Sequence, residues 1–170
     1  GEVLPIVDGP PEFGIFFAHQ AGVYADGVLI QDLEFSAGGA YDDEFESLGG
    51  GDVFAVYCHN SFETELRDLV IDGYGALNGI AILGGQVDVY NPVLMGCPIG
   101  IAAESGFDVA EIDFTLSKAV IGIYNAEISA GFGGFLSTGT SSPSAGIVLM
   151  DSDTTINGAS IDGYMAGIVA

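Results

Sequence analysis

The segment LRDLVIDG at residues 66–73 returns as INGASIDG at residues 156–163, and a tyrosine follows both copies. An earlier copy, IQDLEFSA, lies at residues 30–37. The weaker copies between the two are VYNPVLMG at 89–96, VAEIDFTL at 109–116 and FGGFLSTG at 132–139. From residue 66 onward the copies start 23, 20, 23 and 24 residues apart. A fixed period of roughly 20–50 residues indicates a repeat architecture.

A second marker, a Gly-Ile pair, advances along the chain with the first. It occurs at Gly79-Ile80, Gly100-Ile101, Gly122-Ile123, Gly146-Ile147 and Gly167-Ile168. The glycines are 21, 22, 24 and 21 residues apart. Two markers that step together predict coils that stack on one another, with equivalent side chains in columns.

Two columns of apolar side chains are expected. One contains the five isoleucines of the Gly-Ile pairs, which places Ile101 and Ile123 next to each other. The other contains Ile71, Leu94, Phe114 and Ile161. Asn78, Asn91 and Asn157 are expected at corners that need a positive φ. One conflict exists, because IYNAEISAG at residues 123–131 also fits the first marker; we treat it as a coincidence, since the copy at 132–139 keeps the period.

These observations predict an all-β fold, a right-handed parallel β-helix with coils of about 21–24 residues, as one domain over residues 1–170. Right-handed crossovers are the rule for parallel strands. A β-sandwich offers no reason for this period, and a propeller blade requires about 40 residues.

The repeat resembles the parallel β-helix repeats of the pectate-lyase-like superfamily, well over residues 53–170 and loosely over 14–37. That resemblance implies a fold rather than one function, because the superfamily includes polysaccharide lyases, polygalacturonases, alginate epimerases, phage tailspikes and adhesins.

Composition narrows the choice of partners. The 170 residues include 24 acids and only two bases, Arg67 and Lys118, which gives a net charge of −22. Such a surface repels phosphate backbones and anionic lipids, so we expect no nucleic-acid partner. Hydrophobic residues make up 49%, yet the longest uncharged run, 128–150, contains Pro143 and several glycines, so no membrane span is expected. The acidity suits a neutral or cationic partner, or adaptation to high salt.

The sequence ends at Ile168-Val169-Ala170 without a polar cap. Stacked repeats need covered ends. We therefore expect further coils, a cap or other subunits, including a homo-oligomer. Cys58 and Cys97 leave the state of a disulfide open.

The largest interruption of the repeat, GGAYDDEFESLGGGD at residues 38–52, is an acidic loop insertion. Its acids could hold Ca²⁺ through oxygen ligands, although a solvated loop is the simpler interpretation. These acids are Asp42, Asp43, Glu44, Glu46 and Asp52. Asp68, Asn91 and Glu111, with Asp32 before them, are expected to form an outer column. No motif requires another cofactor.

Exposed tyrosines could bind sugar rings by stacking. Tyr41, in the acidic loop, and Tyr74 and Tyr164, which follow the Ile-Asp-Gly turns, are the ligand-binding candidates. Tyr24, Tyr57, Tyr90 and Phe132 could add to them.

No catalytic constellation is assembled by the sequence. The prediction is therefore a non-catalytic β-helix of an extracellular, cell-surface or virion protein, serving as a stalk or adhesion domain that faces a glycan or receptor. The alternative is a polysaccharide lyase or glycoside hydrolase, for which Asp151, Asp153 and Arg67 are the catalytic candidates.

Overall fold

The computed structural model describes residues 21–23, 26–36, 54–73, 77–107, 116–130 and 145–170. This part of the chain is all-β and contains no helix, and therefore no helix capable of crossing a bilayer. The acidic segment 38–52 lies outside it. The strands are β1 (Ala21–Val23), β2 (Leu29–Gln31), β3 (Glu34–Ser36), β4 (Phe54–Arg67), β5 (Val70–Asp72), β6 (Asn78–Tyr90), β7 (Val93–Met95), β8 (Ile99–Glu104), β9 (Gly106–Phe107), β10 (Leu116–Ser117), β11 (Ala119–Tyr124), β12 (Glu127–Ser129), β13 (Ala145–Met150), β14 (Ser152–Asn157), β15 (Ser160–Asp162) and β16 (Ala166–Val169).

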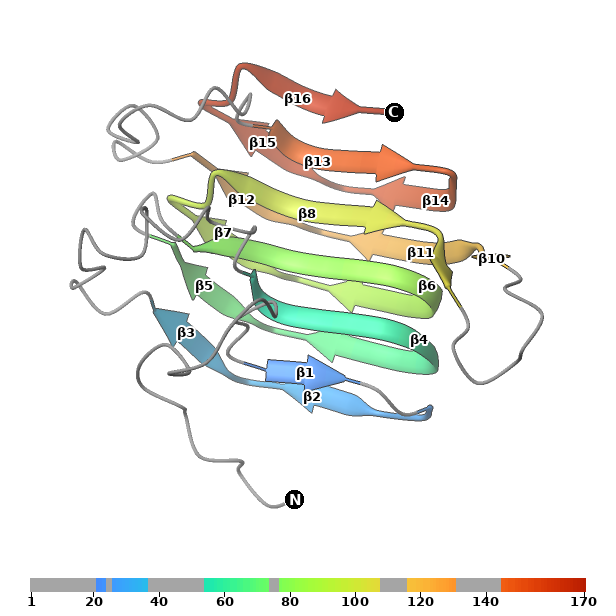
Figure 1. Cartoon of the computed structure of the whole chain (residues 1–170). Coiled ribbons are helices and arrows are strands. Elements are labelled where there is room, and N and C mark those ends of the chain that lie inside the picture. The colour runs from blue at the N-terminus through green and yellow to red at the C-terminus, as the bar shows by residue number, and fades with distance from the viewer. Residues whose placement is uncertain (1–20, 24–25, 37–53, 74–76, 108–115, 131–144) are drawn as a thin grey trace, which may run out of the picture.

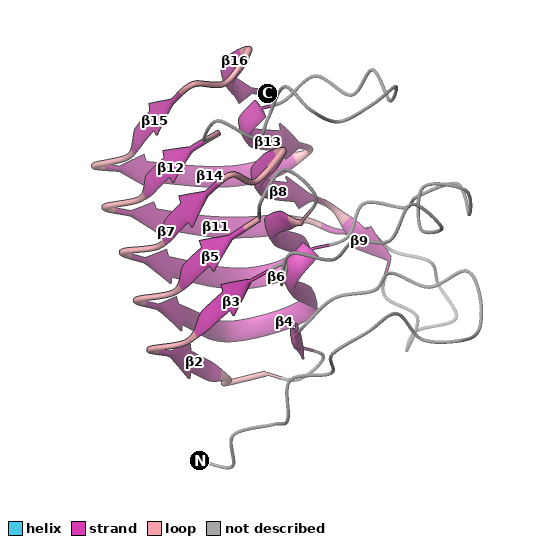
Figure 2. Ribbon diagram, turned by 90° about the vertical axis from the view of Figure 1, so that its left-hand side faces the viewer, coloured by secondary structure: helices cyan, strands magenta, loops and turns pink. Residues whose placement is uncertain are grey.

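The strands form three parallel stacks (Figures 1 and 2). The first stack runs β1, β4, β6, β8, β13, β16. The second runs β2, β4, β6, β11, β14, and the long strands β4 and β6 belong to both. The third runs β3, β5, β7, β12, β15. The chain passes through the three stacks in turn and then returns to the first; we call each passage a repeat. Only β9 and β10 pair antiparallel among the described strands.

Apolar side chains of equivalent positions pair in register. In the first stack Ile80 pairs with Ile101, and Ile101 with Ile147. In the third stack Leu94 pairs with Ile71 on one side and with Ile128 on the other. All six are buried. Because each fully buried aliphatic side chain contributes roughly 1.5–3 kcal/mol, these columns supply much of the cohesion.

The predicted neighbourhood of Ile123 is wrong. Ile123 belongs to the second stack, where it pairs with Val89 and Ile156, and it is not beside Ile101. Ile128 occupies the third-stack position expected for Phe114, which lies outside the described residues. The segment 123–131, treated as a coincidence, is therefore the copy that follows 89–96. Its frame is displaced because the fourth repeat carries additional chain, including β9 and β10, between its first and second stacks.

The corner between the second and third stacks has a positive φ in every repeat, which the sequence predicted only in part. Asp32, Asp68, Asn91, Asn125 and Gly158 occupy it, all with positive φ. Asn and Asp tolerate this left-handed conformation better than other side chains, and glycine adopts it freely.

These corner side chains also contact one another. The Asn91 amide donates to Oδ1 of Asp68 at 2.9 Å, and the Asn125 amide donates to Oδ1 of Asn91 at 3.1 Å. The expected column of Asp68 and Asn91 is thus present, but Asn125 rather than Glu111 continues it. Glu111 lies outside the described residues.

Two of the three asparagine corners were assigned wrongly. Positive φ occurs at Gly158 and not at Asn157. Asn78 is buried within β6, where its Oδ1 accepts a hydrogen bond from the amide of Ile99 at 2.9 Å. It therefore connects neighbouring repeats and does not form a turn.

The Gly-Ile marker has a steric reason where the chain enters the first stack. A Cβ added to Gly100 would lie 2.6 Å from Cγ2 of Ile128 and 2.5 Å from the carbonyl oxygen of Gly146. The residue before the core isoleucine must therefore be small, because the third stack packs against the backbone here.

Candidate binding site on the second stack

The outward side of the second stack carries polar and aromatic residues in register. One row contains Gln31, Arg67, Tyr90, Tyr124 and Asn157. The next row contains Leu29, Glu65, Asp88, Gly122 and Thr155. The intervening residues point inward, as strand alternation requires. We call these two rows, with Gln86 and Asp153 beside them, the outer wall.

Aromatic rings stack along the first row. The rings of Tyr90 and Tyr124 are 4.8 Å apart between centroids with an angle of 11° between their planes. The guanidinium carbon of Arg67 lies 4.4 Å from the Tyr90 centroid. Tyr90 is thus held between a cation and a ring. The second face of Tyr124 is directed toward the next residue of the row, Asn157.

Arg67 is fixed on the wall by an ion pair. Its Nε and Nη2 both lie 2.7 Å from Oε2 of Glu65. A hydrogen bond to Glu65 raises the pKa of Arg67, which remains a cation. Because its charge is shared between Glu65 and the Tyr90 ring, Arg67 serves mainly to hold the aromatic row in place.

A shallow groove of about 330 Å³ lies beside the row. Its lining includes Gln86, Asp88, Gly122, Tyr124, Asp153 and Thr155. The side chains of Asp88 and Tyr124 lie over Gly122, because an added Cβ would clash with Oδ1 of Asp88 and lie 2.7 Å from the Tyr124 hydroxyl. The absence of a side chain at Gly122 therefore lets these two groups lie against the backbone at the edge of the groove.

Asp88 has an altered acidity. Desolvation raises its pKa above the usual value, and the negative charge of Glu65 adds to this, while Arg67 opposes it. At the other side of the groove, Lys118 Nζ and Asp153 Oδ1 form an exposed ion pair of 2.8 Å. The groove thus combines one carboxyl group that ionises less readily with one neutralised by a lysine.

The three catalytic candidates do not come together. Arg67 lies on β4 and Asp153 on β14, and the strands β6 and β11 lie between them in the second stack. At about 4.8 Å per strand, that is roughly 14 Å. Asp151 lies at the bend before β14 with φ 46°, whereas Asp153 lies within the extended strand. What the structure does bring to one groove is Asp153 and Asp88.

Of the three predicted ligand-binding tyrosines, only Tyr164 lies within the described residues. Tyr164 is half-buried, and its hydroxyl donates to the carbonyl oxygen of Cys97 at 2.8 Å. Burial raises its pKa. Tyr41 and Tyr74 lie outside the described residues.

No metal site is found in the part of the chain that the structure describes, where no three His, Cys, Asp or Glu residues gather. The calcium candidates Asp42, Asp43, Glu44, Glu46 and Asp52 all lie outside that part. The prediction of a Ca²⁺ loop therefore stays a prediction.

The sequence analysis did not predict Tyr124 or Asp88 as site residues. Tyr124 was missed because its segment was treated as a coincidence. A signal was present, since VYN at 89–91 and IYN at 123–125 share a tyrosine between an apolar residue and the corner asparagine. Asp88 precedes the marker by one residue and carries no pattern of its own.

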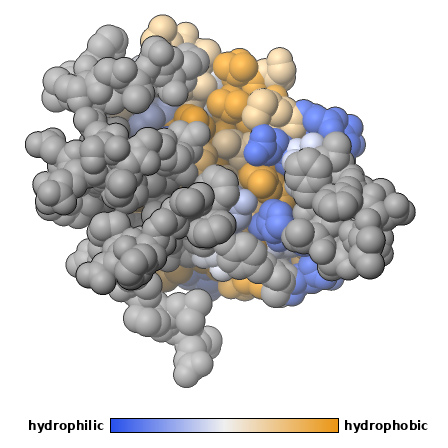
Figure 3. Space-filling model, viewed as in Figure 1, coloured by the Kyte–Doolittle hydropathy of each residue, from blue (hydrophilic) through white to orange (hydrophobic). Residues whose placement is uncertain are grey.

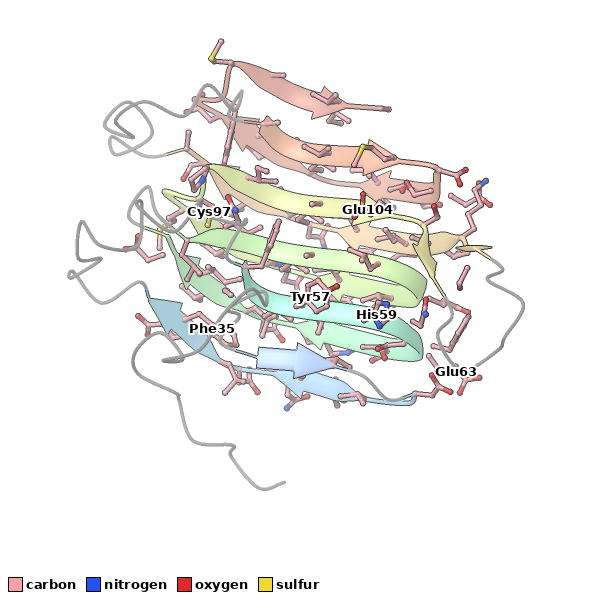
Figure 4. The ribbon with its side chains drawn as sticks, in the orientation of Figure 1. Phe35, Tyr57, His59, Glu63, Cys97 and Glu104 are labelled. Atoms are coloured by element: carbon pink, nitrogen blue, oxygen red, sulfur yellow. The ribbon has the colours of Figure 1, made fainter. Side chains whose placement is uncertain are left out.

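The outer face of the first stack has different chemistry. Phe54, Tyr57 and Ala81 form a small buried cluster, with Leu83, Ile99 and Ala102 packed against it. Figure 3 shows hydrophobic side chains gathered on this side of the molecule. At one edge Tyr57 and His59 stack with 6.3 Å between centroids, and Glu104 lies on the same face (Figure 4). The polar wall is thus a property of the second stack.

Comparison with known proteins adds no relative: no protein-family model matches the chain, and neither does any curated protein or solved structure. The interpretation of the outer wall depends on its own geometry.

Proposed function

We propose that the chain is a stretch of right-handed parallel β-helix, displayed outside the cell, on a cell surface or on a virion, where it serves as a rigid scaffold and binds a glycan or receptor. The observation that carries this proposal is the in-register parallel pairing of equivalent residues through successive repeats. Such stacking gives an extended, stiff body with long flat faces, which suits display and adhesion. Right-handed winding is the expected hand of its crossovers.

The outer wall of the second stack supports a binding role. It offers ordered tyrosines and hydrogen-bonding side chains along a single face. The net charge of −22 disfavours acidic partners and leaves neutral or cationic ones.

The last repeat supports contact with additional protein. Met165, Ile168 and Val169 are 80%, 50% and 43% exposed. Apolar side chains at a strand edge favour pairing with another strand. We propose that another subunit, such as a second copy of the chain, covers them. Sedimentation of a form with Ile168→Lys and Val169→Lys should then show less self-association than the parent chain.

The test of the binding role is to incubate the chain with a panel of neutral and acidic polysaccharides and to measure retention and product release. Retention on a neutral polysaccharide without new reducing ends or unsaturated products is the expected result. Absence of retention on every polymer would count against glycan binding and would leave a protein receptor to be sought.

A second candidate function, polysaccharide hydrolysis, is favoured by one observation. Asp88 and Asp153 line the same groove, and the pKa of Asp88 is raised. Two carboxyl groups in one groove, one of them with a raised pKa, are the arrangement of glycoside hydrolases. If this function is present, reducing ends accumulate with time, and Asp88→Asn and Asp153→Asn each abolish them.

A further inference from the structure

The groove over Gly122 has three distinct sides. The ring of Tyr124 lies on one side, the carboxyl group of Asp88 on another, and the β14 residues Asp153 and Thr155 on the third. Gly122 has no side chain, so the Tyr124 ring and the Asp88 carboxyl group lie close to the backbone and close to each other.

The aromatic row ends at this groove. Arg67 covers one face of Tyr90, and Tyr90 covers one face of Tyr124. The next residue in register is Asn157, whose side chain is too small to continue the ring stack. The second face of Tyr124 is thus directed toward the side of the groove that β14 forms, and Arg67 and Tyr90 hold its plane in a fixed orientation.

The polar groups around this ring suit hydroxyl groups. Asp88 accepts hydrogen bonds, Gln86 both donates and accepts, and the Thr155 hydroxyl does either. A sugar ring presents C–H groups on its faces and hydroxyl groups on its rim, so it can stack on Tyr124 while its rim contacts these side chains. A volume of about 330 Å³ is at the small end of ligand pockets, which fits a single ring with its neighbours extending into solvent.

Charge restricts the class of sugar. Lys118 is paired with Asp153 and Arg67 with Glu65, and these are the only two Lys or Arg residues of the chain. No Lys or Arg outside these two ion pairs is left to bind a uronate, sulfate or phosphate group, and Asp88 would repel one once ionised. The groove accordingly favours a ring without acidic substituents.

We propose that this groove is a subsite for one uncharged pyranose residue of a glycan, stacked on Tyr124 and hydrogen-bonded to Asp88. The inference rests on the glycan-binding role proposed above and places that role at one position on the outer wall.

The test uses the full chain with cellohexaose, laminarihexaose, mannohexaose and hexagalacturonate as probes, measured by calorimetric titration and by the shift of the Gly122 amide signal in NMR. A neutral hexasaccharide should bind and move this signal, while hexagalacturonate should bind at least tenfold more weakly. Gly122→Ala, whose Cβ would displace Tyr124 and Asp88, should reduce affinity about tenfold or more. Tyr124→Ala should do the same, and Tyr124→Phe, which keeps the ring, should retain most of the affinity.

Gly167→Ala is the matched control, because it adds the same methyl group where no atom lies within 4 Å. Variants whose circular-dichroism spectra and melting temperatures equal those of the parent chain have lost binding and not folding. Undiminished binding in Gly122→Ala and Tyr124→Ala would overturn the subsite while the proposed function stands. Tighter binding of hexagalacturonate would overturn the charge class. No binding of any hexasaccharide would overturn the subsite together with the glycan-binding role.

Discussion

The middle repeats and the last repeat contain the same residue at the same position, yet bury it differently. Ile101 and Ile147 are 0% exposed, whereas Ile168, the next isoleucine in that column, is 50% exposed. The difference arises because each repeat buries the apolar side of its neighbour and cannot bury its own. Position within the stack, rather than residue identity, therefore sets the contribution of each isoleucine to stability.

The largest expected effect comes from breaking this column in the middle. Ile101→Ala should lower the free energy of unfolding by roughly 2–5 kcal/mol, because it removes buried atoms and leaves a cavity. Ile168→Ala, the matched change at the exposed position, should cost less than about 1 kcal/mol. Urea denaturation followed by circular dichroism measures both. Similar losses in the two variants would contradict a stability set by the neighbouring repeat.

A second effect concerns the thiols of the interior. Cys58 and Cys97 are free and buried, and desolvation raises the pKa of each from 9.0 to about 12. Both should remain unlabelled by a thiol reagent at pH 8 in the folded chain and react rapidly after unfolding in urea.

The same thiols predict a dependence on pH. As the pH rises, unfolded thiols ionise near 9.0, whereas folded ones stay protonated until about 12. The unfolded state therefore releases protons first, so their contribution to stability is complete below pH 9 and is lost between pH 9 and 12. A Cys58→Ala, Cys97→Ala double variant should show a smaller loss over that range. An equal loss would assign it to other groups.

The smallest of the three effects separates backbone strain from hydrogen bonding at the corner. Asn91→Ala places an alanine at φ 50° and removes the contacts to Asp68 and Asn125. A loss of about 1–2 kcal/mol is expected from the left-handed conformation alone. Asn91→Gly removes the same side chain without that strain and should lie about 1 kcal/mol closer to the parent. Thermal melts that rank the two variants the other way would contradict backbone strain at this corner.

Local pattern was sufficient to predict most of the strand pairing. The Gly-Ile pairs at Gly79, Gly100, Gly146 and Gly167 do precede the paired isoleucines of the first stack. Leu94 pairs with Ile71 as expected. These predictions succeeded because the period of the repeat and the alternation of a strand are both carried by adjacent residues.

The same reasoning failed where the repeat lengthens. Ile123 was assigned to the first stack because Gly122-Ile123 resembles the other pairs, but the additional chain after β8 places it in the second. A Gly-Ile pair alone does not reveal which stack it enters. The stack that a segment joins is decided by the strand with which it pairs, and that strand is distant in sequence.

The candidate site was predicted less well than the fold. Arg67 and Asp153 do lie on the outer wall, but roughly 14 Å apart along the stack. No local pattern singles out Tyr124, Asp88 and Gly122 as one site. They lie on two strands, β6 and β11, that only pairing brings side by side.

The sequence by itself determined the all-β character, the period and the acidity, because composition and local spacing encode each of them. Tertiary structure alone decided which strand each copy joins, where the aromatic row ends and which carboxyl groups share a groove. The physical reason is that parallel pairing joins residues about one repeat apart, so the additional chain of the fourth repeat changes the partners of the segment that follows it without changing the local pattern of that segment.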